Sequence, residues 1–129
     1  MLDTNTVSDL MRWPVGRVAT KLRQLGPGEA CASIVTSAEL RYGAHKVASK
    51  RLLKQVETVL TLVPPEPLNL PADETYASIR VALEKDGRPI GPNDLLIAAH
   101  ALALNLTLVT ANHREFSRIA GLRVENWLD

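Results

Sequence analysis

The run LLIAAHALAL, residues 95–104, is the feature that most constrains the fold, because it is apolar on nearly every face. A helix formed by such a run must be buried over most of its surface, and not only along one stripe. Asp94 stands directly before the run, although carboxylates are rarely buried without a partner. The fold must therefore enclose this helix and also supply a group that accounts for Asp94 at its front.

The chain has 129 residues and a hydrophobic content of 46%, which suits one compact domain over residues 1–129. No apolar run reaches the roughly 20 residues of a membrane span, because Asn105 ends the longest one. The first residues do not have the pattern of a secretion signal, and the lone Cys31 has no partner for an internal disulfide. We therefore expect a reduced, cytoplasmic protein without membrane contact, in which Cys31 is a small buried residue.

Positive charge is concentrated in the first part of the chain. Residues 1–60 contain nine Lys and Arg against five Asp and Glu, whereas residues 61–129 contain six against nine. Much of the excess lies in RYGAHKVASKRLLK, residues 41–54. This segment is either a solvated helix face or a phosphate-binding surface, and in the second case Lys50, Arg51 and Lys54 would contact a nucleic-acid substrate.

Helical and extended segments alternate along the chain. Apolar spacing and capping residues predict helices over residues 4–12, 16–25, 36–48, 50–60, 71–87 and 93–104. Short strands are expected at residues 1–2, 30–35, 106–110 and 122–127, while the prolines of residues 60–70 make that extended segment a poor central strand. The alternation indicates an α/β fold of three layers, in which helices cover both faces of a small, mainly parallel sheet.

Polar side chains gather at one end of this predicted sheet. Ligands of such folds bind beyond the carboxyl ends of the strands, and six polar residues follow strands or open the next helices: Asp3, Glu39, Asp94, Thr110, Asn112 and Glu115. Each acid also has a purely structural explanation. Asp3 can cap the following helix, Glu39 completes the capping box TSAE, and Asp94 gains from the helix dipole. Structural roles explain each residue separately, but not their convergence.

Divalent-metal chemistry explains the whole set better. Mg²⁺ prefers oxygen ligands and is often held by few carboxylates together with substrate phosphates. Such a site neutralises charge at a scissile phosphate. Asp94 would then be a carboxylate offset by a cation and by the amides at the start of the buried helix.

The motifs LDTN, SIVTSAELRYGA, GPNDLLIAAHALALNLTLVT and TANHREF, in this order, resemble the PIN-domain ribonucleases, and specifically the VapC toxins of bacterial toxin–antitoxin pairs. The likeness extends from Asp3 to about Trp127. It implies a PIN-like domain with Mg²⁺- or Mn²⁺-dependent endoribonuclease activity, a VapB-type antitoxin and a homodimer. Transfer RNA is a known substrate class of such toxins.

The resemblance also assigns roles to individual residues. Asp3, Glu39 and Asp94 match the three principal acids, which hold the metal, while Asn5 and Thr110 match supporting polar positions. Many relatives carry Asp where this chain has Asn112, so Glu115 is the candidate for the missing carboxylate. We therefore predict that Glu115 supplies the fourth negative charge and that Asn112 orients the Glu115 carboxylate.

Other functions fit the sequence less well. An aspartate-based phosphatase usually needs a second acid where this chain has Asn5, and a phosphoacceptor receiver domain needs a Lys late in the fold, whereas no Lys follows Lys85. His45, His100 and His113 have no zinc-like spacing, and no GxxxxGK[ST] phosphate loop is present. A PIN-like domain that binds RNA or a partner without cutting stays open as an alternative.

Overall fold

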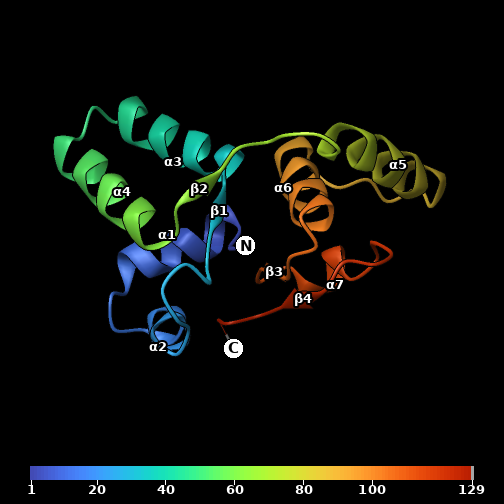
Figure 1. The fold of residues 1–129 in the computed structure, drawn as a ribbon. Helices are drawn as coiled ribbons and strands as arrows, with labels where there is room; N and C mark the ends of the chain where they lie inside the picture. Colours follow the sequence, from blue (N-terminus) through green and yellow to red (C-terminus); the bar gives the residue numbers. More distant parts are fainter. Residues whose placement is uncertain (129) are drawn as a thin grey trace.

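The structure is a computed structural model and describes residues 1–128. The chain forms seven helices and four short strands in that range, and their arrangement is drawn in Figure 1. The helices are α1 (Thr4–Arg12), α2 (Arg17–Arg23), α3 (Ile34–Lys46), α4 (Lys50–Leu62), α5 (Ala72–Lys85), α6 (Pro92–Ala103) and α7 (His113–Phe116). The strands are β1 (Ala32–Ser33), β2 (Pro65–Glu66), β3 (Leu108–Val109) and β4 (Val124–Glu125).

The strands form a small parallel sheet whose centre is Leu2. Leu2 makes parallel bridges to Ala32 of β1 on one side and to Val109 of β3 on the other. β2 pairs with β1 and β4 pairs with β3, both in parallel. The order across the sheet is therefore β2, β1, the Leu2 segment, β3 and β4. Since every segment runs in the same direction, all carboxyl ends meet at one edge.

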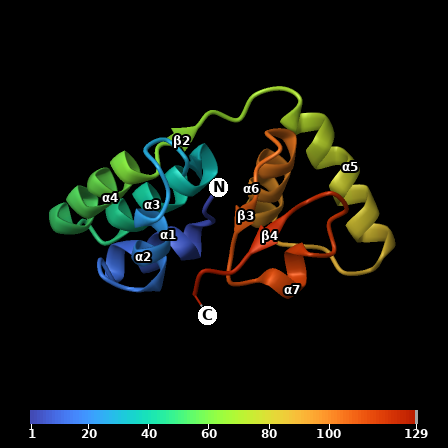
Figure 2. The same cartoon turned by 60° about the horizontal axis from the view of Figure 1, so that its bottom comes forward.

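Helices cover both faces of this sheet, as predicted for a three-layer α/β/α fold. In Figures 1 and 2, α1 to α4 lie on one side of the N-terminal segment, and α5, α6 and α7 lie on the other. Two hydrophobic clusters correspond to the two faces: Leu2 and Val109 belong to the cluster of α1–α4, while Met1 and Leu108 belong to that of α5–α7. This alternation follows from the two-residue period of a strand.

The apolar run forms the best-buried helix of the chain. In α6, Ile97, Ala98 and Ala101 have no measurable exposed surface. The helix ends at Ala103, with Leu104 as its C-cap, so it stops just before Asn105 as predicted. Asn105 adopts a left-handed conformation with φ of 56° that Asn tolerates better than most residues. Within residues 1–128, no helix is long and apolar enough to cross a membrane.

Two local predictions were wrong. Residues 30–35 do not form one strand, because β1 contains only Ala32 and Ser33 and α3 begins at Ile34. The capping box of Thr36 and Glu39 is also absent, since Ser33 is the N-cap and its side chain accepts a hydrogen bond from the Val35 N–H. Thr36 instead lies buried inside the helix. Glu39 is therefore beyond the first turn, and the cap no longer explains it.

Other expectations hold in part. The extended segment after α4 provides β2, which pairs only with β1 and is an edge strand, as its prolines favour. Trp127 packs into the α1–α4 cluster with 9% of its surface exposed. Cys31 is only half-buried, at the margin of the other cluster, and burial raises the pKa of its thiol.

Candidate active site

Asp3 lies at the carboxyl end of the central sheet segment and caps helix α1. Its Oδ1 accepts hydrogen bonds from the Thr6 backbone N–H at 2.9 Å and from the Thr6 hydroxyl at 2.7 Å. Only 3% of its surface is exposed. The structural explanation for Asp3 is thus correct, but it uses one carboxylate oxygen and leaves the other for a second role.

Glu39 reaches the same edge of the sheet from α3. Its Oε1 accepts a hydrogen bond from the Thr4 hydroxyl at 2.6 Å, and its Oε2 accepts one from the Asn93 amide at 3.3 Å. Thr4 directly follows Asp3, and Asn93 directly precedes Asp94. The Glu39 carboxylate is therefore held between the residues next to the two other predicted acids.

Asp94 is in the first turn of α6 and is half-buried. Its pKa is raised, first by desolvation and then by the negative charges of Asp3, Glu39 and Glu115. Repulsion of this kind requires that the four carboxylates lie near one another. Four segments that are distant in the sequence therefore bring their acids to one place, as the strand-end argument predicted.

Asn112 and Glu115 follow β3 and take different positions. Thr110 is fully buried, and its hydroxyl accepts a hydrogen bond from the Asn112 backbone N–H at 3.0 Å, which shapes the turn before α7. Asn112 is exposed at the start of α7, whereas Glu115 is half-buried and its charge acts on Asp94. Both line a common pocket.

The remaining predicted residues lie outside this acid cluster. Asn5 is exposed in the first turn of α1. Lys50, Arg51 and Lys54 are exposed at the start of α4, and two of them line a different cavity, described below. The geometry therefore brings together the acids but not the predicted basic segment.

The cluster fits a divalent cation by its chemistry more than by its present arrangement. Its donors are carboxylate oxygens, which Mg²⁺ and Mn²⁺ prefer. Within residues 1–128, however, no three His, Cys, Asp or Glu side chains are placed to hold a metal ion together. Glu39 instead faces Thr4 and Asn93. The carboxylate side chains would have to move toward one another to share one ion.

Three residues that support the acids were not predicted from the sequence. Thr6 binds Asp3, while Thr4 and Asn93 bind Glu39. The position of Thr6 three residues after a helix-capping Asp was a usable signal. The contacts to Glu39 join residues 35 and 54 positions apart in the sequence, and no local pattern could have shown them.

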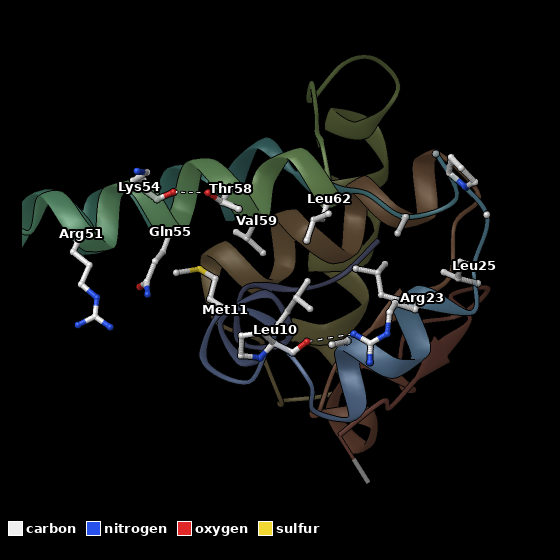
Figure 3. Close-up of a pocket in the computed structure, with 17 residues that line it drawn as sticks. Leu10, Met11, Arg23, Leu25, Arg51, Lys54, Gln55, Thr58, Val59 and Leu62 are labelled. Atoms are coloured by element: carbon white, nitrogen blue, oxygen red, sulfur yellow. Dashed lines mark hydrogen bonds between the residues drawn. The ribbon is translucent and has the colours of Figure 1, made fainter.

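A separate apolar groove lies between α1, α2 and α4. It has a volume of about 720 Å³. Figure 3 shows Leu10, Met11, Val59 and Leu62 around it. Arg23, Arg51 and Lys54 supply positive charge at its lining. Two of the three predicted phosphate contacts therefore belong to this groove.

Comparison with known proteins agrees with the fold. The PIN domain family model matches residues 1–122. The chain therefore belongs to the PIN-domain family, as the sequence motifs predicted.

Individual relatives narrow the class further. The tRNA(fMet)-specific endonuclease VapC of Shigella flexneri is 38% identical over 128 residues, which cover 98% of this chain and 96% of the relative. The VapBC2 complex of Rickettsia felis, bound to a promoter DNA fragment, has a chain that superposes with a TM-score of 0.89 at 36% identity, covering 98% of this chain and 97% of that chain. DNA-bound VapBC of Salmonella typhimurium gives 0.91 at 36% identity, with coverages of 98% and 96%. The protein is thus similar over nearly its whole length to VapC ribonucleases of toxin–antitoxin systems.

Proposed function

We propose that this protein is a metal-dependent endoribonuclease and the toxin of a toxin–antitoxin pair. The observation that carries this proposal is that Glu39 accepts hydrogen bonds from Thr4 and Asn93, the residues next to Asp3 and Asp94. In addition, desolvation and then the charges of Asp3, Glu39 and Glu115 raise the pKa of Asp94. Acids so arranged destabilise one another unless a cation or a substrate group offsets their charge. Support also comes from the VapC relatives, whose names describe ribonucleases.

Asp3, Glu39 and Asp94 would hold Mg²⁺, or Mn²⁺ in its place. The bound ion supplies positive charge that offsets the charge developing on a scissile phosphate. The buried body of α6 fixes the position of Asp94 at the front of the helix. The Thr4 and Asn93 contacts hold Glu39 beside it.

The remaining site residues would support these acids. Glu115 adds a fourth negative charge to the acid cluster. Asn112, which follows β3, orients the Glu115 carboxylate. Thr110 fixes the turn through its bond to the Asn112 N–H, and Asn5 offers an exposed amide in the first turn of α1, two residues after Asp3. Lys50, Arg51 and Lys54 remain proposed contacts to the RNA backbone further from the cleaved bond.

The proposed substrate is RNA, with transfer RNA as the first class to examine, because a relative is named as a tRNA(fMet)-specific endonuclease. We further propose that the protein forms a homodimer and acts in the cytoplasm, where its substrate is found. These statements extend the family assignment to this chain and are independent of the metal.

Cleavage in the presence and absence of metal tests the nuclease proposal. Purified protein, freed of antitoxin, is incubated with labelled initiator tRNA and total tRNA, with Mg²⁺, with Mn²⁺ or with EDTA. We expect cleavage with either ion and none in EDTA. Full activity in EDTA would exclude the metal-dependent mechanism, and binding of RNA without cleavage under every condition would favour the non-cutting alternative.

We also propose that the groove between α1, α2 and α4 binds the VapB-type antitoxin. Support comes from its apolar lining with basic side chains at the margin, and from structural neighbours that are VapBC complexes. An apolar segment flanked by acids would fit this surface. The gene encoding such an antitoxin is expected next to the gene of this protein.

Replacement of one exposed groove residue tests this second site. Leu62 lines the groove and is 55% exposed, so Leu62→Glu should leave folding intact and weaken capture of the neighbouring antitoxin in co-purification. Leu104→Glu is the matched control, because Leu104 is 45% exposed and does not line the groove. Equal capture by both variants would place the antitoxin elsewhere.

A further inference from the structure

A pocket with three arginines adjoins the acid cluster. It has a volume of about 370 Å³ and is lined by Arg88, Ala111, Asn112, Arg114, Glu115 and Arg118. Asn112 and Glu115, two of the candidate site residues, line it, so the pocket shares residues with the candidate active site. Its lining carries three positive charges and one negative charge, whereas the acid cluster consists of carboxylates.

Arg118 builds the wall of this pocket. Its Nη1 donates a hydrogen bond to the Arg88 carbonyl oxygen at 2.8 Å, and its Nε donates one to the Glu115 carbonyl oxygen at 3.2 Å. The side chain is only 19% exposed. Arg118 thus ties the loop between α5 and α6 to α7, and it fixes where Arg88 and Glu115 stand relative to one another.

Arg88 and Arg114 provide the accessible positive charge. Arg88 pairs with Asp86 at 3.0 Å, but both side chains are more than half exposed, and exposed pairs of this kind contribute little stability. The exposed Arg114 guanidinium has no hydrogen-bond or ion-pair partner within residues 1–128. A ligand anion could therefore engage both guanidinium groups without breaking a strong contact.

We propose that Arg88 and Arg114 bind a phosphate of the RNA backbone next to the bond that is cleaved. This rests on the proposed nuclease function and adds a binding site to it. Four carboxylates repel an approaching phosphodiester, so a substrate needs positive charge close to them. Guanidinium groups suit this role, because their donors match the oxygens of a phosphate in pairs.

The position of this pocket distinguishes it from the basic segment of α4. Arg51 and Lys54 line the apolar groove, whereas Arg88 and Arg114 share a pocket with Glu115. Phosphate contacts give affinity and register without selecting a base. The pocket should therefore fix where the backbone enters the acid cluster, whatever the RNA sequence.

Binding to a short mixed-sequence single-stranded RNA tests the proposal. The RNA carries fluorescein, and anisotropy is measured in EDTA over a range of salt concentrations with Asp94→Asn as the background, so that no cleavage interferes. Arg88→Gln/Arg114→Gln is compared with Arg17→Gln/Lys21→Gln, which removes the same charge from exposed positions on α2. Arg118 is left unchanged because it holds two backbone carbonyl groups.

We expect the Arg88 and Arg114 double variant to bind the RNA more weakly and to lower the salt slope by about 0.7, since the two arginines neutralise one phosphate and each phosphate contact to a single strand contributes about 0.7. The α2 control should keep the parent slope. Equal slopes for the two variants would overturn the phosphate site. If the parent protein cleaves RNA but the Arg88 and Arg114 double variant keeps the parent salt slope, only the phosphate-site proposal is overturned. If RNA binding depends on the two arginines but the parent protein cleaves no RNA, only the nuclease proposal is overturned.

Discussion

The two ends of helix α6 carry polar groups in opposite situations. At its first turn, Asp94 is half-buried, and desolvation followed by the charges of three neighbouring carboxylates raises its pKa. In its last turn, His100 is 1% exposed and bonded through both ring nitrogens, with Nδ1 at 2.8 Å from the Ser33 hydroxyl and Nε2 at 3.0 Å from the Pro67 carbonyl oxygen. At the first end, carboxylates therefore repel one another, whereas at the other end both ring nitrogens of His100 have hydrogen-bond partners.

The partners of His100 define its protonation state. The Pro67 carbonyl oxygen can only accept, so Nε2 carries the proton. Nδ1 then accepts from the Ser33 hydroxyl, whose oxygen also caps α3. Burial lowers the pKa of His100 and keeps the ring neutral. This difference is expected if the first end serves the proposed chemistry and the second end serves the fold.

The first prediction separates activity from stability at Asp94, and has the largest expected effect. Asp94→Asn keeps the size of the side chain but removes a ligand charge, so RNA cleavage should fall by orders of magnitude. The same change removes charge repulsion, so the melting temperature in EDTA should stay the same or rise. A clear loss of melting temperature would instead show that Asp94 mainly stabilises the start of α6.

The second prediction concerns the fourth charge at the same end. Glu115 acts on Asp94, whereas Asn112 is exposed and carries no charge. Glu115→Gln should therefore reduce cleavage at limiting Mg²⁺ by about 10- to 100-fold, as expected for a group that supports metal ligands, and high Mn²⁺ should reduce the loss. Asn112→Ala should cost less activity.

Asn112→Asp provides the matched gain of charge. It should preserve activity or partly rescue Glu115→Gln, because it returns a carboxylate to the same pocket. If Glu115→Gln cleaves RNA as fast as the parent at limiting Mg²⁺, only three acids belong to the site.

The third prediction tests the fully bonded end. His100→Ala should lower the free energy of unfolding by about 1–3 kcal/mol for each buried partner that is left unsatisfied. His100→Gln, which retains a donor near the Nε2 position, should lose less. Thermal unfolding measures both, and His113→Ala is the control because His113 is exposed. Equal stability of all three variants would mean that the two hydrogen bonds do not stabilise the fold.

The sequence predicted the first end of α6 better than the second. The apolar run and the Asp before it indicated a buried helix whose first turn has a polar function. The rule that side chains at the carboxyl ends of parallel strands meet at one edge correctly predicted that Asp3, Glu39 and Asp94 lie near one another. For His100, the sequence showed only that the histidines have no zinc-like spacing. Its partners lie 67 and 33 residues away, so its role depends on how the sheet and the crossover segment fold together, which local spacing does not encode.

The boundaries of β1 show the same limit. An apolar run such as ACASIV fits a strand or a buried helix turn equally well by periodicity. In the structure the Ser33 hydroxyl favours the helix because it caps α3 and is fixed by His100. A long-range hydrogen bond therefore helps to set a boundary that local residue preferences leave open.

The smallest predicted effect is that acidification changes the free energy of unfolding in opposite directions through His100 and through Asp94. His100 has a lowered pKa when folded, so between its usual value near 6.5 and the lowered value the unfolded chain binds more protons, and its contribution to stability is lost on acidification. Asp94 has a raised pKa when folded, so between the raised value and 3.8 the folded chain binds more protons, and acid relieves its cost. Relative to the parent, His100→Gln should therefore lose less stability between pH 7 and 5, whereas Asp94→Asn should lose its stability advantage as the pH falls further. Urea unfolding at a series of pH values, with Glu66 left intact because its charge also favours protonated His100, measures both differences. Parallel curves for the parent and both variants would show that neither end of α6 titrates with folding.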